Sequence, residues 1–233
     1  MMRKNLLSLF VLFIFLFAFM GCSPSLAVNI ATTNDVSVEF SSGLGESLVQ
    51  TLYSITDMDS QNPLFNKKAV AANLGAAGFT VENISVDNNN IYLKTKSSSF
   101  KDIVANSSEL VEELTPSSVK LSFSSEKLQD FVSVLPEETV GYLDLLCAPV
   151  LTNEELSTDD YVDVLAAIYG KKLAQETLSS NFVIEISVGS KIKSIDVKIP
   201  NSKTVTNNNK ARITIPLADF LCNLDESTVN ITW

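Results

Sequence analysis

The chain has 233 residues and a formal net charge of −10, and this length is sufficient for one sizeable domain. An acidic chain is a poor partner for nucleic acid, because basic residues that neutralise phosphates supply most of the affinity of nucleic-acid-binding proteins. Histidine is absent, which excludes Ser-His-Asp and Cys-His catalysis and removes the commonest metal ligand. We therefore expect no nucleic-acid partner, no catalytic residues, no metal site and no cofactor.

The amino terminus has the pattern of a secretory signal peptide. A positive head at Arg3 and Lys4 precedes an apolar run, Leu6–Met20, which closes on Gly21. A charged head, an apolar run and a small residue at the cleavage point follow one another in such signals. The run is shorter than the roughly 20 residues that a permanent membrane-spanning helix needs. We therefore expect the segment to be removed after Gly21.

The residues at the cleavage point, Phe19-Met-Gly-Cys22, resemble the lipobox of bacterial lipoproteins. The resemblance implies acylation of Cys22 and attachment through its acyl chains to a membrane of the bacterial cell envelope, facing the periplasm or the exterior. An ordinary signal peptide and an uncleaved anchor are the alternatives. The chain then divides into a signal peptide, a lipidated cysteine with a short tether, and one α+β domain, at residues 1–21, 22–27 and 28–233.

The first part of the domain combines short strands with two helices. Residues 28–30 and 36–40 alternate between polar and apolar with a period of two, which predicts two strands. Leucine recurs at helical spacing from Leu44 to Ile55, which predicts a helix. A polar loop over 57–63 and an alanine-rich helix over 67–77 are expected to follow.

A hairpin and a third helix are expected next. The alternating stretches 79–86 and 91–95 flank Asp87-Asn-Asn-Asn90, and Asn and Asp tolerate the backbone geometry of tight turns. The weakly amphipathic stretch 100–114 predicts a helix that ends before Pro116.

The rest of the chain passes from a helical block back to strands. Residues 119–123 predict a strand, and 125–178 predict a largely helical block in which Ser157 and Asp160 have the spacing of a helix cap. The expected strands at the carboxy terminus are 182–188, 192–199, 212–215 and 229–233. The predicted fold class is α+β, with antiparallel β-hairpins packed with a mostly helical central segment.

An internal duplication is also consistent with the sequence. Val36–Ser42 is similar to Val119–Ser125, and Phe79–Val86 is similar to Phe182–Val188. The order of strand, helices and hairpin would then occur twice, in half-repeats 35–115 and 118–200. Chance similarity between alternating strands is the alternative.

Charge is distributed unevenly along the chain. Acidic residues concentrate between Glu109 and Asp163, whereas basic residues gather in the carboxy-terminal hairpins. An anionic leaflet attracts the basic hairpins and repels the acidic segment, so the sequence predicts a membrane-facing basic patch. Ordinary solvated surface is the alternative. The predicted patch consists of Lys191, Lys193, Lys198, Lys203, Lys210 and Arg212.

Two cysteines and two Ser-x-x-Lys motifs, Ser98–Lys101 and Ser124–Lys127, are candidate chemical sites. Cys147 and Cys222 can form a disulfide outside the cytoplasm, or remain buried thiols in their apolar surroundings; the sequence leaves both alternatives open. Ser124 and Lys127 have the Ser-x-x-Lys spacing of penicillin-recognising enzymes. The companion Ser-Asp-Asn and Lys-Thr-Gly motifs are missing, so we expect no catalysis there.

The carboxy-terminal third has a distinctive order of strands and turns, namely Val183–Gly189, Lys191–Ser194, the asparagine-rich turn Asn207–Asn209 and a final strand ending at Trp233. In this order it resembles LppM-type bacterial lipoprotein domains. The resemblance implies an envelope-anchored α+β domain that binds lipid or a partner protein, and it brings no catalytic residues. The long helical insertion departs from the pattern.

The predicted function is that of a membrane-anchored bacterial lipoprotein without enzymatic activity, acting as a binding or structural module at the cell envelope. Its partner would be an unknown protein or apolar ligand. The alternatives are a surface-exposed, adhesin-like interaction protein and a carrier of lipid or another apolar ligand.

Overall fold

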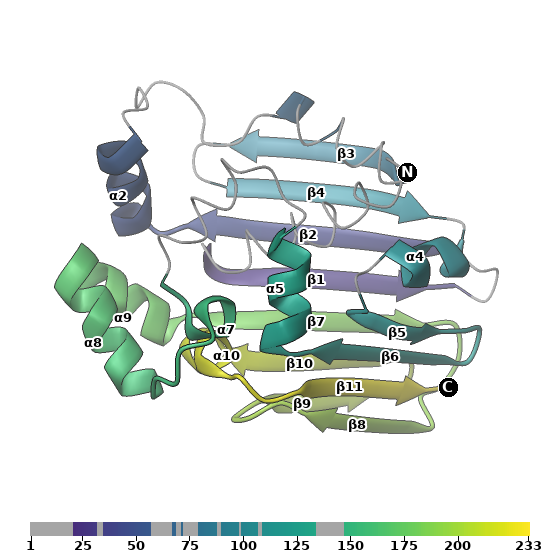
Figure 1. The fold of residues 1–233 in the computed structure, drawn as a ribbon. Coiled ribbons are helices and arrows are strands. Elements are labelled where there is room, and N and C mark those ends of the chain that lie inside the picture. The colour runs from purple at the N-terminus through teal and green to yellow at the C-terminus, as the bar shows by residue number, and fades with distance from the viewer. Residues whose placement is uncertain are drawn as a thin grey trace.

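Two β-sheets form the framework of the protein in the computed structural model (Figure 1). The structure describes residues 21–31, 35–56, 67–68, 71, 79–87, 90–97, 99–106, 109–133 and 147–233.

The large sheet has seven strands in the order β3-β4-β2-β1-β7-β10-β9. Every neighbouring pair is antiparallel except β1 and β7, which run parallel. The strand that begins nearest the amino terminus, β1, is therefore the central strand. The bounds are β1 Gly21–Ile30, β2 Val36–Leu44, β3 Thr80–Asp87, β4 Asn90–Ser97, β7 Asn181–Val188, β9 Lys203–Asn207 and β10 Lys210–Pro216.

The small sheet has four antiparallel strands in the order β5-β6-β11-β8. In Figure 1 it lies in front of the part of the large sheet that β7, β10 and β9 form. The bounds are β5 Val111–Leu114, β6 Ser118–Phe123, β8 Ser194–Lys198 and β11 Ser227–Thr232.

Short helices surround the sheets. In Figure 1, α2, α8 and α9 lie at the end of the large sheet where β1 begins, α4 lies at the opposite end, and α5 lies in front of the sheet. The bounds are α2 Glu46–Thr56, α4 Phe100–Asn106, α5 Ser125–Ser133, α7 Pro149–Thr152, α8 Thr158–Tyr169, α9 Lys171–Ser179 and α10 Leu217–Cys222.

The core lies between the two sheets, and Phe220 of α10 joins them. Its ring centroid is 5.7 Å from that of Phe182 on β7 and 6.1 Å from that of Phe123 on β6. All three rings are buried. Because aromatic pairs at such distances add about 1 kcal/mol each to the free energy gained from burial, Phe220 is a main link between the layers.

The predicted fold class is wrong in its central feature. The fold is mostly β, with two sheets at its centre, and not a set of hairpins packed on a helical segment. Helices α5, α7, α8 and α9 occur in the block 125–178, but they are short and lie around the sheets. The parallel pairing of β1 with β7 also departs from the predicted antiparallel arrangement.

The predicted half-repeats occupy positions that are not equivalent. Strand β2 lies inside the large sheet, whereas β6, its counterpart in the second half, belongs to the small sheet. Strand β3 is an edge strand, whereas its counterpart β7 pairs on both sides. The strand order thus gives the matched segments different neighbours, and the duplication stays a prediction.

Three local predictions also differ from the structure. The segment expected as a tether, 22–27, lies within β1. The expected helix 100–114 ends at Asn106, and Val111–Leu114 forms strand β5. Strand β9 was not predicted, because all five of its residues are exposed and show no apolar face. The expected signal peptide up to Met20 and the polar loop 57–63 lie outside the described residues.

Candidate functional site

The most distinctive surface is the outer face of the large sheet, the face that points away from the small sheet and the core. Along β4, Ile91, Leu93 and Thr95 are buried in the core, whereas Tyr92, Lys94 and Lys96 point outward. This alternation follows from the pleat of a strand, which sends successive side chains to opposite faces.

A row of charged residues crosses the middle of the outer face. In it, Lys94 Nζ lies 3.0 Å from Glu39 Oε1, and Arg212 is ion-paired with Glu185. The hydrogen bond that Lys94 donates to Glu39 raises the pKa of Lys94. Exposed pairs of this kind contribute little to stability, so their main effect is to neutralise four charges. From β4 to β10 the row reads Lys94, Glu39, Ala27, Glu185 and Arg212.

The next row, two residues further along each strand, has lysines at its ends. We call it the lysine row. At about 4.8 Å per strand, its ends are about 19 Å apart. Among the described residues, neither of its lysines forms an ion pair, and the three residues between them are small and polar. From β4 to β10 the lysine row reads Lys96, Ser37, Asn29, Ser187 and Lys210.

A third lysine without a described ion pair, Lys203, lies on the edge strand β9 next to Thr214. The strands of the outer face carry one carboxylate, Asp87, for which no ion pair occurs among the described residues. Glu82, in contrast, lies 3.8 Å from Lys94 Nζ. The unpaired charges of this face are therefore mainly positive, although the whole chain is acidic.

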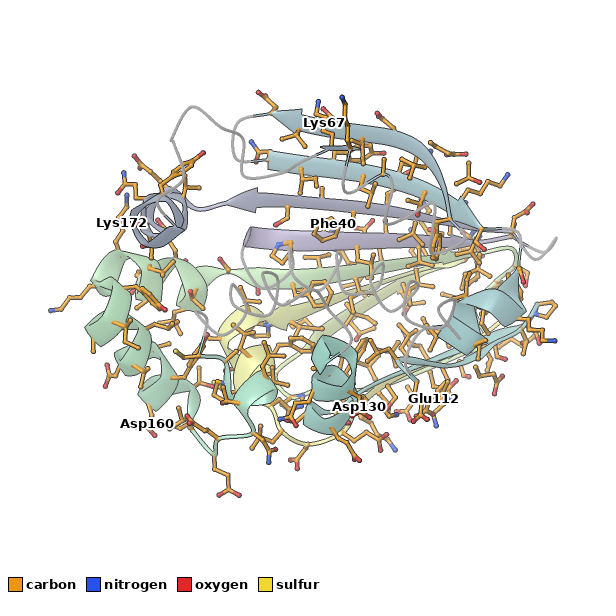
Figure 2. The ribbon with its side chains drawn as sticks, turned by 45° about the horizontal axis from the view of Figure 1, so that its top comes forward. Phe40, Lys67, Glu112, Asp130, Asp160 and Lys172 are labelled. Carbon is orange, nitrogen blue, oxygen red and sulfur yellow. The ribbon has the colours of Figure 1, made fainter. Side chains whose placement is uncertain are left out.

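The opposite side of the molecule is acidic. Asp130 on α5, Asp160 on α8 and Glu112 on β5 lie on the side of the helices and the small sheet (Figure 2). Asp159 and Asp163, on α8, are exposed as well. The exposed aspartates of α8 thus lie on a different side of the molecule from the lysines of the outer face.

A polar groove of about 270 Å³ lies at the end of the outer face where β1 begins. The backbones of Cys22, Gly43, Asn90 and Asp87 are neighbours across four strands at this end. A Cβ at position 43 would lie 2.5 Å from Asn90 Oδ1, so glycine there leaves room for the Asn90 side chain. The groove is lined by Ser41, Ser42, Gly43, Ser85, Asp87, Asn90, Ile91 and Tyr92.

Half of the predicted basic patch lies on the outer face, namely Lys203, Lys210 and Arg212. The other three lysines do not join them. Lys191 and Lys193 follow the end of β7, and Lys193 Nζ donates to the Trp233 carbonyl at 3.1 Å. Lys198 lies on the small sheet, 3.9 Å from Asp196.

Sequence reasoning missed Lys94 and Lys96, which complete the positive charge of the outer face. Their spacing of two within an alternating strand indicates that they share one face of β4. No local signal places them in the same rows as Lys210 and Arg212, because β1 and β7 connect the two halves of the sheet.

The Ser-x-x-Lys motif forms a helix start and an ion cluster. Ser124 Oγ accepts the Lys127 backbone N–H at 3.2 Å and caps α5. Lys127 Nζ lies 2.6 Å from both Glu112 and Ser122 Oγ, and 3.4 Å from Glu226. An amine held between two carboxylates is a paired cation, whereas a serine nucleophile needs a neutral amine as its base.

Glu112 is the centre of this cluster. Hydrogen bonds from Lys120, at 2.5 Å, and from Lys127 lower the pKa of Glu112 to about 2. The side chain also lines an open groove of about 720 Å³ between α4 and β5, together with Phe100, Val104 and Leu114. This groove is mainly apolar, with Lys101 and the carboxylates at its rim.

Cys147 and Cys222 are thiols that no disulfide joins, and both are half-buried. Burial raises the pKa of the Cys222 thiol to about 11, and Cys222 Sγ lies 3.9 Å from the Ser157 carbonyl. Burial also raises the pKa of Tyr161, and both thiols add to that shift. Both cysteines are thus near one buried tyrosine.

Metal binding and membrane crossing each need a structural feature that the described part of the chain does not have. They bring together no group of three or more cysteine or carboxylate side chains that could hold a metal ion. Within the same residues, no helix combines the length and apolar character that crossing a membrane requires.

Comparisons with known proteins give one structural likeness. No family model matches the chain, and no curated protein matches it. Among solved structures, the chain is similar to the NMR structure of the folded domain of LppM from Mycobacterium tuberculosis. The TM-score is 0.38 at 7% sequence identity, with 92% of each chain covered. A likeness at this level carries no information about function.

Proposed function

We propose that the protein is a bacterial lipoprotein, acylated at Cys22 and held in a membrane of the cell envelope. The observation that carries the proposal is the order of charged head, apolar run and Phe19-Met-Gly-Cys22 at the amino terminus. Two or three acyl chains on one cysteine meet the requirement for stable attachment, which a single chain does not.

The position of Cys22 in the fold makes this attachment short. Its backbone pairs with Gly43 inside the large sheet, in the central strand β1. Acyl chains on Cys22 would thus tie the sheet to the bilayer without a spacer. The domain would act within a few ångströms of the lipid headgroups.

Incorporation of labelled palmitate into the chain produced in a bacterium tests the anchor. The wild type is expected to be labelled and to begin at Cys22 by mass spectrometry. Cys22→Ser should abolish the label, whereas the matched control Cys222→Ser should retain it. Equal labelling of Cys22→Ser and the wild type would refute the proposal.

We propose that the domain works by binding or by structural support, and not by catalysis. The absence of histidine and the pairing of Lys127 with two carboxylates support this assignment. Its partner on this proposal is a protein or an apolar molecule of the envelope.

The groove between α4 and β5 supports a second candidate function, the binding of an apolar ligand. Its volume of about 720 Å³ lies in the range of sites for small molecules. Native mass spectrometry of the protein with a fatty acid as probe is expected to show a one-to-one complex that Val104→Glu removes. A complex that survives this change would place the ligand elsewhere.

A further inference from the structure

We propose that the outer face of the large sheet lies flat on the anionic headgroups of the bilayer that holds Cys22. The inference rests on the proposed acylation of Cys22 and adds an orientation to it. Membrane contact would then involve strands β4, β9 and β10, and the acidic helices would point away from the lipid.

The first step is geometric. Cys22 lies in the central strand of the sheet and pairs with Gly43, so the bilayer must contact a surface adjacent to the start of β1. The inner face of the sheet is covered by the small sheet and the helices (Figure 1). Two surfaces remain, namely the outer face and the end of the sheet that α2, α8 and α9 occupy.

Charge distinguishes these two surfaces. The end of the sheet presents the exposed Asp159, Asp160 and Asp163 of α8. They outnumber the exposed Lys171 and Lys172 of α9, and Lys172 is ion-paired with Glu46 of α2. An anionic leaflet repels an acidic helix and attracts lysine and arginine. The outer face presents Lys96 and Lys210, for which no ion pair occurs among the described residues. An anionic leaflet therefore attracts the outer face and repels the end of the sheet that carries α8.

Along the lysine row, the outer face has no bulky side chains that would keep it away from a flat bilayer surface. In the lysine row the residues between Lys96 and Lys210 are Ser37, Asn29 and Ser187, none of which is bulky. Lysine side chains are long and flexible, so both ends of the row can reach the same plane of phosphates. The polar groove lined by Asp87 and Asn90 faces the same way, beside the anchor.

Quenching of introduced tryptophans tests the orientation. Lipidated protein is reconstituted in vesicles of phosphatidylethanolamine and phosphatidylglycerol that contain a lipid with a nitroxide on its headgroup. Val205→Trp places a probe on the outer face, where Val205 is 65% exposed, and Ala167→Trp places a matched exposed probe on α8. The native Trp233 is 4% exposed and provides a constant background.

The expected result is at least twofold stronger quenching of Val205→Trp than of Ala167→Trp. Stronger quenching of Ala167→Trp, or quenching of neither beyond the wild-type background, would overturn the orientation. The second outcome would leave the face free for an acidic protein. Palmitate incorporation is measured on the same samples, so an unlipidated sample counts against the anchor, whereas a lipidated but unquenched sample counts against the orientation.

Charge removal tests the cause of the orientation. The triple change Lys96→Gln, Lys203→Gln and Lys210→Gln is expected to weaken contact of the outer face with the bilayer. The ratio of protein with this face on the lipid to protein with this face in solvent should fall roughly a hundredfold, since each lysine near an anionic surface contributes about a fivefold factor. The control variant also replaces three lysines by glutamine, at positions that do not lie on the outer face. Equal effects of the two triples would overturn the proposal. The control changes are Lys101→Gln, Lys171→Gln and Lys172→Gln.

Discussion

The Oδ1 atom of Asn90 lies 2.5 Å from the position that a Cβ at residue 43 would take. This contact joins β4 to β2 at the end of the sheet where Cys22 lies. A larger residue at position 43 would therefore force the Asn90 side chain to move. The Gly43–Asn90 contact can therefore be tested by a pair of substitutions.

Gly43→Ala is expected to lower the free energy of unfolding by about 1 kcal/mol, because Asn90 must leave its position. The same change in an Asn90→Ala background should cost almost nothing. Urea denaturation of the four proteins in this cycle measures the coupling. Equal costs in both backgrounds would contradict the contact.

Glu112 is expected to make the protein acid-sensitive between about pH 4.5 and pH 2. Its pKa is lowered from 4.5 to about 2 by hydrogen bonds from Lys120 and Lys127. A carboxylate with a lowered pKa stabilises the fold above its unfolded pKa, and this contribution is lost as the pH falls through the folded value. Because solvent screens this part-exposed cluster, the expected contribution is about 1 kcal/mol.

The measurement is the free energy of unfolding as a function of pH for Glu112→Gln and for an exposed control, Glu154→Gln. Glu112→Gln should be less stable than the wild type at pH 6, and the difference should shrink towards pH 2. A difference that is independent of pH would show that the lysines do not stabilise the ionised form.

Phe220 is expected to be essential for holding the two sheets together. Phe220→Ala removes a buried ring in contact with Phe182 and Phe123, and large-to-small changes of this kind cost about 3–5 kcal/mol. Val205→Ala, at a 65% exposed position, should change stability by less than about 0.5 kcal/mol. If Phe220→Ala prevents folding, Phe220→Leu should still fold and lose a smaller amount, measured by urea denaturation.

Cys222 is expected to react slowly with alkylating reagents at neutral pH. Its thiol has a pKa of about 11 because of burial, so at pH 8 roughly one thiol in a thousand is ionised. Raising the pH from 7 to 9 should therefore increase the alkylation rate about a hundredfold. Glutathione in the same tube serves as the reference thiol, and mass spectrometry locates the adduct.

The same experiment distinguishes the two states of the cysteines. Reduced thiols, as the structure has them, should be alkylated in the unfolded protein without a reductant. Modification that requires prior reduction would instead demonstrate a disulfide between Cys147 and Cys222.

Local signals in the sequence predicted local structure well. The spacing of Ser157 and Asp160 predicts a helix start, and the Ser157 side chain does accept the Asp160 backbone N–H. The hairpin around Asp87–Asn90 is present, with these two residues paired. Both features depend on contacts between residues close in the sequence, which a pattern of residue types can encode.

The sheet arrangement could not be predicted in this way. The pairing of β1 with β7 joins Ser25 to Val183, and no local pattern reports a neighbour so distant in the sequence. The stretch Val111–Leu114 pairs with β6, and this partner overrides the weak helical pattern around it. The composition of the lysine row depends on the same distant pairings, which is why the predicted basic patch was only half complete.

The central position of β1 has a consequence for the order of events in the cell. Strand β1 needs β7 as its neighbour, so the large sheet cannot close until Asn181–Val188, in the last third of the chain, has been synthesised. Long-range pairing of this kind also makes folding slow. On the proposal that the chain is an exported lipoprotein, this delay would keep it unfolded long enough to be threaded through an export channel.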